Sequence, residues 1–259
     1  MKNSSKGSLV TGLISVSILG LPLIQAATLK VDFNVNGGSS GTASGYTSIS
    51  GSNGSDLSAT SLNLGSDSFQ VSIDARNSDG SDDGNTRWID RENPGTGVWS
   101  GAAANPLSQD WVSTDDFRDY LVLTFSGLEA GTYDLTTIHG DWNGNTVTRI
   151  DVQGSVNGGT SYINLQDGPV YDARQGPGGS TVGPATVTID NTFTANGADD
   201  VIFLFHAGAN KFGDAGNTGS SNVNRFVALN GFELSSVPEP SSTVLLGLGG
   251  LAFVMYRRK

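Results

Sequence analysis

The feature that most constrains the fold is the alternation of apolar and polar residues along short segments. Apolar side chains occupy every second position in residues 29–35, and residues 69–75 repeat the pattern. A period of two places successive side chains on opposite faces and therefore predicts strands with one buried face. No segment between the two chain ends shows the 3.6-residue period of an amphipathic helix. The sequence therefore predicts an all-β domain.

More apolar segments follow, joined by glycine-rich connections. Strands are expected at residues 120–126, 132–138, 147–156, 160–165, 185–190, 201–205 and 226–234, with a short one at 46–49. Residues 127–131 predict a hairpin between the first two, and Asn157-Gly158-Gly159 predicts one between the next two. Long connections are expected at 37–65, 76–116 and 166–183. This pattern, with roughly nine short strands, indicates one antiparallel β-sandwich, most simply a jelly roll.

The N-terminus has the composition of a secretory signal peptide. Lys2 and Lys6 precede an apolar segment at residues 9–24, and the small residues Ala26 and Ala27 follow it. This order predicts export and cleavage after Ala26, with an uncleaved membrane anchor as the alternative. The sequence thus divides into a signal peptide (1–26), a β-sandwich ectodomain (27–236) and a C-terminal tail (237–259).

The tail combines three features in one order. A short motif, Val237-Pro238-Glu239-Pro240, stands before an apolar segment, and a basic cluster, Arg257, Arg258 and Lys259, stands after it. The segment itself, residues 242–256, has no charge. A membrane-spanning helix needs about 20 apolar residues, so this span is short, and the basic cluster predicts a cytoplasmic end. A buried C-terminal element of a soluble domain is the other interpretation.

This tail resembles the PEP-CTERM sorting signal of Gram-negative, biofilm-forming bacteria. The resemblance covers only residues 237–259 and rests on the motif, the span and the basic cluster standing in that order. It implies export by the Sec machinery and temporary anchoring in the inner membrane by one transmembrane helix. It also implies recognition near Pro238-Glu239-Pro240 by an exosortase, and a final place at the cell surface or in the extracellular matrix.

The charge and the lack of cysteine exclude several classes of protein. The chain has no cysteine, so a catalytic thiol and a cysteine-ligated zinc site are excluded. Between residues 27 and 236 stand nine Lys and Arg and 24 Asp and Glu, a formal charge of −15. Nucleic-acid binding needs cationic side chains, so it is not expected, whereas divalent cations suit such a surface.

An acidic turn is the best candidate for a metal site. Asp79, Ser81 and Asp83 place oxygen atoms at alternate positions before Gly84, and Asp90 stands twelfth counted from Asp79. Oxygen ligands followed by glycine are typical of calcium loops, although serine at the third position and Arg87 at the ninth depart from an EF-hand. The alternative is a solvated acidic turn.

Aromatic and polar residues after a strand are the best candidates for carbohydrate binding. Residues 139–143 read His139, Asp141, Trp142 and Asn143 around one glycine, and Trp99 and Trp111 can join them. An indole ring stacks on the apolar face of a sugar, while carboxylate and amide groups bind its hydroxyls. The alternative is that the tryptophans pack inside the domain.

The ectodomain also resembles galactose-binding-like jelly rolls, a class that includes modules attached to carbohydrate-active enzymes. The resemblance rests on residues 31–33, 45–47, 116–120, 131–135, 140–141 and 229–234. It implies a jelly-roll fold and carbohydrate recognition.

Catalysis is not expected. Only His139 and His206 are available as imidazole bases, and no Gly-x-Ser-x-Gly motif is present. The sequence therefore favours a non-enzymatic surface or matrix protein that binds exopolysaccharide. A calcium-stabilised structural protein and a carbohydrate-active enzyme that uses Asp141 or His139 are the alternatives.

Overall fold

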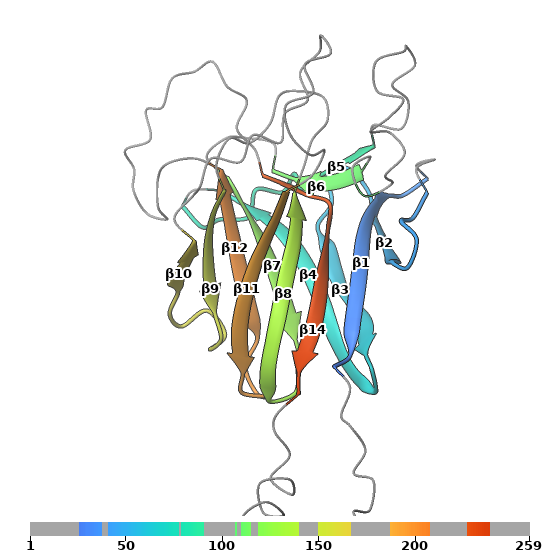
Figure 1. The fold of residues 1–259 in the computed structure, drawn as a ribbon. Coiled ribbons are helices and arrows are strands. Elements are labelled where there is room, and N and C mark those ends of the chain that lie inside the picture. The colour runs from blue at the N-terminus through green and yellow to red at the C-terminus, as the bar shows by residue number, and fades with distance from the viewer. Residues whose placement is uncertain are drawn as a thin grey trace, which may run out of the picture.

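The computed structural model describes residues 26–37, 41–77, 79–90, 107, 110–114, 119–139, 150–166, 187–207 and 227–238. Two sheets face each other in it, and a third, smaller sheet lies across one end (Figure 1). The expected all-β sandwich is therefore confirmed. None of the described residues form a helix long and apolar enough to cross a bilayer. The expected anchor helix at 242–256 and nearly all of the signal peptide lie outside the described residues.

Sheet A has five strands and carries both ends of the domain. In spatial order its strands are β11 (Val187–Ala195), β8 (Gly131–His139), β14 (Gly231–Val237), β1 (Thr28–Val35) and β2 (Thr47–Gly51). The first strand thus pairs with the last, antiparallel, with Thr28 opposite Ser235. The β1–β2 pair is parallel, which corrects the expectation of a purely antiparallel sandwich.

Sheet B has six strands and forms the other layer. In spatial order they are β10 (Ile163–Gln166), β9 (Ile150–Ser155), β12 (Val201–Ala207), β7 (Tyr120–Ser126), β4 (Asp67–Arg76) and β3 (Leu57–Leu64). The predicted β9–β10 hairpin is confirmed. Strand β3 lies within a segment that was expected to be a connection, so that expectation was wrong.

The predicted hairpin at residues 127–131 is also wrong. Strand β7 pairs with β4 and β12 in sheet B, whereas β8 pairs with β11 and β14 in sheet A. The turn therefore crosses from one layer to the other, and buried Leu128 closes the core beneath it. Adjacent strands in a sandwich can exchange sheets in this way without any change in their local pattern.

Sheet C crosses one end of the sandwich. It contains β13 (Ala228–Leu229), β6 (Asp110–Ser113) and β5 (Arg87–Asp90). The last two strands were missed because residues 76–116 lack a regular apolar period.

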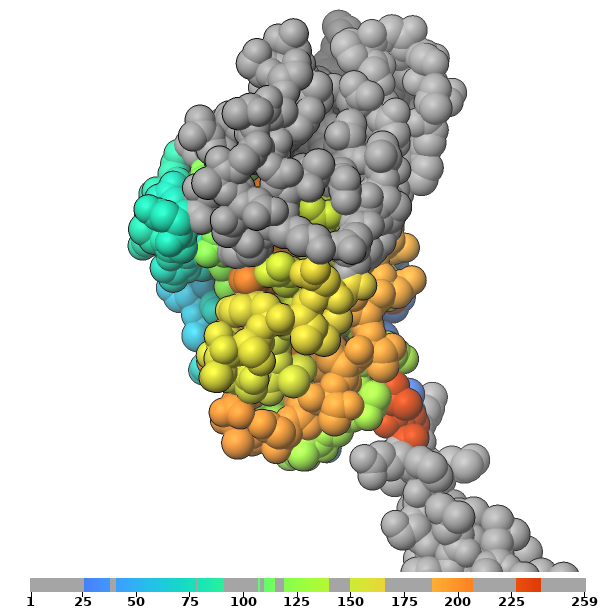
Figure 2. Space-filling model, turned by 90° about the vertical axis from the view of Figure 1, so that its left-hand side faces the viewer, coloured from blue at the N-terminus to red at the C-terminus, as the bar shows by residue number. Residues whose placement is uncertain are grey.

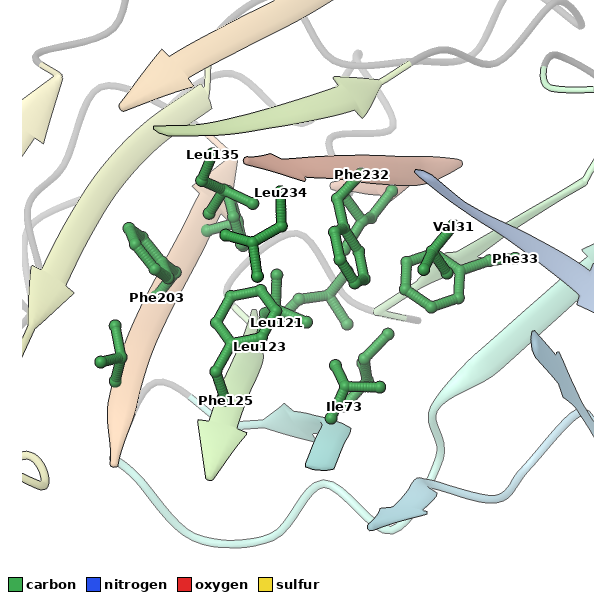
Figure 3. Close-up of a cluster of buried hydrophobic side chains, with 14 of the residues drawn as sticks. Val31, Phe33, Ile73, Leu121, Leu123, Phe125, Leu135, Phe203, Phe232 and Leu234 are labelled. Carbon is green, nitrogen blue, oxygen red and sulfur yellow. The ribbon is translucent and has the colours of Figure 1, made fainter. Parts of the chain in front are cut away.

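Phenylalanine rings from both layers meet in the core (Figure 3). Phe125 of sheet B stands edge-on to Phe232 of sheet A, with ring centroids 5.3 Å apart. Phe33 packs against the other side of Phe232 at 5.9 Å. All three are fully buried, and burial of such a side chain contributes about 1.5–3 kcal/mol. The domain has no disulfide, so this apolar contact between the layers is its main source of stability.

Candidate functional site

The two ends of the domain lie side by side at one end of the sandwich, here called the tail end. The Ala27 amide donates to Ser236 Oγ at 3.1 Å, and the Ser236 amide donates to the Ala27 carbonyl at 2.9 Å. Val237 is the last residue of β14 and lies opposite Thr132. Strands β5 and β6 cross the opposite end, here called the distal end (Figure 1). The tail therefore leaves the domain directly from a core strand, far from sheet C.

Short turns join the strands at the tail end, and longer connections join them at the distal end. Residues 65–66, 127–130 and 196–200 make the turns at the tail end. At the distal end β8 stops at His139 and β9 starts at Ile150, and the connections after β10 and β12 are longer still. Long connections on a rigid scaffold are where binding residues usually lie.

Trp88 of β5 closes the core at the distal end. Its Nε1 donates to the Ser55 carbonyl at 2.9 Å, and its ring stands edge-on to Phe33 with centroids 6.2 Å apart. A Cβ atom added at Gly51 would lie 2.0 Å from this ring, so only glycine fits there. Trp111 of β6 is fully buried, so it packs in the interior and presents no face to a sugar.

His139, at the end of β8, is buried and hydrogen-bonded on both ring nitrogens. Nδ1 lies 2.8 Å from the Ala228 carbonyl, which can only accept, so Nδ1 carries the proton. Nε2 then accepts from the Thr137 hydroxyl at 2.8 Å, and the ring packs against Phe205. Burial lowers the pKa of His139 to about 4, although the bond to Ala228 opposes the shift. The imidazole is therefore neutral at pH 7 and joins β8 to β13; it does not face a ligand.

The other residues predicted to bind carbohydrate, Trp99, Asp141, Trp142 and Asn143, lie outside the described residues. The last three stand between His139 and Ile150, which both belong to the distal end. Their predicted role stays a prediction.

The acidic turn is held by its own hydrogen bonds. Asp79 Oδ1 accepts from the Ser81 hydroxyl at 2.6 Å and from the Ser81 amide at 2.9 Å. These bonds lower the pKa of the Asp79 carboxyl. Asp90 belongs to β5, and the Asp83 amide donates to the Ala75 carbonyl at 3.1 Å. Within the described part, the carboxylates of Asp79, Asp83 and Asp90 do not come together as a cluster of three.

A different carboxylate trio gathers beside this turn. One oxygen each from Asp56, Asp74 and Asp82 lies within 4.8 Å of the others, an arrangement that can hold a divalent cation. Burial, and then the charge of Asp56, raise the pKa of Asp74, although Arg76 pairs with its Oδ2. The outward position of Asp74 in the alternating strand β4 was the available sequence signal; Asp56, 18 residues earlier in the chain, offered none.

A second set of polar contacts ties β14 to the N-terminal strands. Lys30 Nζ lies 2.8 Å from Glu233 Oε1, and the Tyr46 hydroxyl donates to the same oxygen. Burial alone would raise the pKa of Glu233, but the bonds from Lys30 and Tyr46 lower it. Asp32, buried beside them, accepts from the Ala43 amide at 2.7 Å, and burial raises its pKa. Glu233 thus fastens the strand that carries the tail to the N-terminal segment of the domain.

The C-terminal tail matches a known protein-sorting motif. A family model described as the PEP-CTERM protein-sorting motif matches residues 236–259. This chain carries a PEP-CTERM sorting motif. The motif implies processing by an exosortase, and export with membrane anchoring before a place at the surface. Because Val237 ends β14, the PEP-CTERM motif begins at the edge of the folded domain, with no spacer between them.

No curated protein sequence matches this chain, and several solved structures resemble it weakly. The K2 cleaved adhesin domain of Lys-gingipain is 16% identical, with 64% of this chain and 89% of that one covered and a TM-score of 0.34. A family 35 carbohydrate-binding module from Clostridium thermocellum is 10% identical over 62% and 96%, at 0.30.

A third structure is the N-terminal part of endo-1,4-β-D-xylanase 10B from Clostridium thermocellum, complexed with xylohexaose. It is 9% identical, with 64% of this chain and 26% of that one covered and a TM-score of 0.34. All three scores lie below 0.5, so no activity follows from these likenesses.

Proposed function

We propose that the protein is a non-enzymatic surface or matrix protein whose distal end binds exopolysaccharide. The observation that carries this proposal is that the sorting tail and the long connections lie at opposite ends of the sandwich. The sorting tail leaves one end, and the long connections leave the other.

Anchoring at the tail end points the distal end away from the membrane. Strand β1 has eight residues, which at about 3.3 Å per residue span roughly 26 Å. Connections at the distal end would therefore stand clear of lipid head groups and face the polysaccharide outside the cell. The short turns, by contrast, would lie near the membrane until the tail is processed.

The state of His139 supports a role without catalysis. A general base must lie within hydrogen-bonding reach of the substrate proton that it removes. A histidine works best as a general base when its pKa lies near the working pH. His139 is buried, both of its nitrogens are occupied, and its pKa falls to about 4. Its arrangement suits a structural link between strands.

A polysaccharide panel tests the binding proposal. The processed protein, purified from the producing cells, is applied to neutral and acidic polysaccharides that include the producer's own. Trp142→Ala is expected to weaken binding at least about tenfold, which corresponds to about 1.4 kcal/mol. Trp99→Ala tests the second candidate ring in the same way.

The matched control is Tyr162→Ala, because Tyr162 is 40% exposed and follows a turn at the tail end. Its loss should leave glycan binding unchanged. If the wild-type protein binds no polysaccharide, or if all three variants bind equally well, the binding proposal is wrong.

Sorting has a separate test, which does not depend on any ligand. Mass spectrometry of the mature protein is expected to show a new N-terminus near Ala27 and a C-terminus near Pro238. A full-length product that remains in the inner membrane would mean that the tail acts only as an anchor.

Calcium stabilisation of a structural surface protein is the second candidate function. It is favoured by the trio of Asp56, Asp74 and Asp82. Calcium would offset the mutual repulsion of these carboxylates, so thermal melts should shift upward with calcium in wild type and not in Asp82→Asn. An identical melting temperature with calcium and with chelator would reject this candidate.

A further inference from the structure

The β9–β10 hairpin exposes apolar side chains on one side of the sandwich. Ile163 is 65% exposed, Val156 41% and Tyr162 40%, and these are three of the four large exposed apolar residues in the described part of the chain. Figure 2 shows the hairpin, in yellow, at the molecular surface facing the viewer. Isolated exposed apolar residues are ordinary, but a cluster of them marks an interaction surface.

This hairpin extends beyond the edge of sheet A. The outer strand of sheet A, β11, faces β12, since Phe193 packs on Phe203 with ring centroids 5.4 Å apart. Strands β9 and β10 continue past that contact (Figure 1). Leu165 covers Gly154, where an added Cβ would lie 2.6 Å from it. Ile163, two residues earlier, has no such cover.

Strand β10 is also the outer strand of sheet B, and no described strand pairs with its second side. An open edge presents backbone donors and acceptors to any other strand, and proteins usually protect it with charged side chains. Residues 152–166 contain no charged residue, although the whole chain carries a net charge of −11. Two copies of an acidic protein repel each other electrostatically, and this repulsion is smallest when the uncharged edge of one copy contacts the same edge of the other.

We propose that β10 pairs with β10 of a second copy of this chain. The strands run antiparallel across a two-fold axis, and the two six-stranded sheets become continuous. The Ile163 side chains of both copies then lie on the same face of the joined sheet, because such an axis stands perpendicular to it. This self-association goes beyond polysaccharide binding and requires no glycan.

The geometry also sets the direction of the two copies. An antiparallel pair reverses the strand direction, and the strands run roughly from the tail end to the distal end (Figure 1). The two tails therefore leave the dimer in opposite directions. Such pairing joins molecules on facing surfaces, or molecules released into the matrix, and not neighbours anchored in one membrane.

The contact is small, since β10 has four residues. Interfaces below about 1,200 Å² are usually transient, and they become effective when many copies act together. The test therefore uses multivalent particles: vesicles of phosphatidylethanolamine and phosphatidylglycerol that hold the chain with its C-terminal tail unprocessed, residues 27–259, by that tail.

Wild-type vesicles are expected to cluster without added polysaccharide, as light scattering would measure. Ile163→Glu places like charges opposite each other and is expected to lower the clustering at least about tenfold. The matched control, Thr188→Glu, adds the same charge to an exposed position of β11 and should cluster as wild type does. Both positions are on the surface, and a thermal melt of each variant checks its fold.

The absence of cysteine permits a second readout. A two-fold antiparallel pair places only one residue of each strand opposite its own copy, here Ile163, so the single variant Ile163→Cys should form disulfide-linked dimers under mild oxidation, because paired strands bring Cα atoms within about 5.5 Å. Asn164→Cys, whose side chain points to the opposite face, should form fewer dimers. Thr188→Cys should remain monomeric. Wild-type vesicles that stay dispersed, or dimers that form equally at position 188, would overturn the proposal; either result leaves the polysaccharide panel unaffected.

Discussion

The burial of His139 predicts a specific loss of stability in mild acid. In the folded protein the pKa of His139 is about 4, whereas an unfolded histidine has a pKa of about 6.5. Above pH 6.5 the imidazole is neutral in both states and contributes no pH dependence. As the pH falls below 6.5, the unfolded chain binds a proton that the folded chain refuses, so the free energy of unfolding decreases.

The two pKa values set the size of this effect. At pH 5 the unfolded imidazole is almost fully protonated and the folded one almost fully neutral, which corresponds to a loss of about 2 kcal/mol. Below pH 4 the loss approaches about 3 kcal/mol. Asp32 and Asp74 act in the opposite direction, because their raised pKa values let the folded state gain protons first. Comparison of variants is therefore needed to isolate the histidine.

His139→Asn is the decisive variant. Its amide nitrogen can still donate to the Ala228 carbonyl, but it does not titrate, and it loses the bond from Thr137. It should be less stable than wild type at pH 7. The stability difference between the two proteins should then shrink by about 2 kcal/mol when the pH falls to 5.

Urea unfolding at pH 7, 6 and 5, followed by tryptophan fluorescence, measures the difference. The control His206→Asn removes the only other imidazole of the chain and should keep the loss that His139 causes. Parallel pH profiles for wild type and His139→Asn would refute the argument, because they would mean that His139 binds its proton equally well in both states.

Two further predictions concern packing and the fastening of β14. Gly51→Ala should lower the free energy of unfolding by about 1–3 kcal/mol, because the added methyl group overpacks against Trp88. Gly41→Ala is the control and should be close to neutral, because nothing lies within 4 Å of its added Cβ. Thermal melts of both variants measure the difference. Tyr46→Phe should lower the free energy of unfolding by about 1 kcal/mol, because it removes the hydrogen bond to Glu233. Urea unfolding measures this change, and equal stability of wild type and variant would mean that the bond contributes nothing.

The elements that the sequence predicted well are those whose pattern is local. Strands β1 and β4 alternate without interruption, and β12 is continuously apolar. Strand β3 was missed because its pairing shifts register between Leu57 and Thr60. Buried Leu57 therefore does not fall in the same alternation as the later buried residues, Leu62 and Leu64. A bulge of this kind hides a strand from any test of strict alternation.

The site was predictable only in part for a related reason. His139 and Trp111 were candidates for ligand binding because of their residue types, but both side chains are buried in the interior. The carboxylate trio joins Asp56 before β3, Asp74 within β4 and Asp82 in the following turn, so only the folded chain brings it together. Polar side chains gather across strands at distances that sequence spacing does not record.

What the sequence alone determined is therefore the β class, the acidic surface and the sorting tail, because periodicity, composition and an ordered motif are each contained in one short stretch of chain. The tertiary structure decided that residues 127–131 cross between sheets, and that the first and last strands of the domain meet at the end opposite the long connections. It also decided that no described strand pairs with the outer side of the uncharged strand β10. These features depend on which strands pair across the whole chain, and strand pairing is set by packing between the two layers.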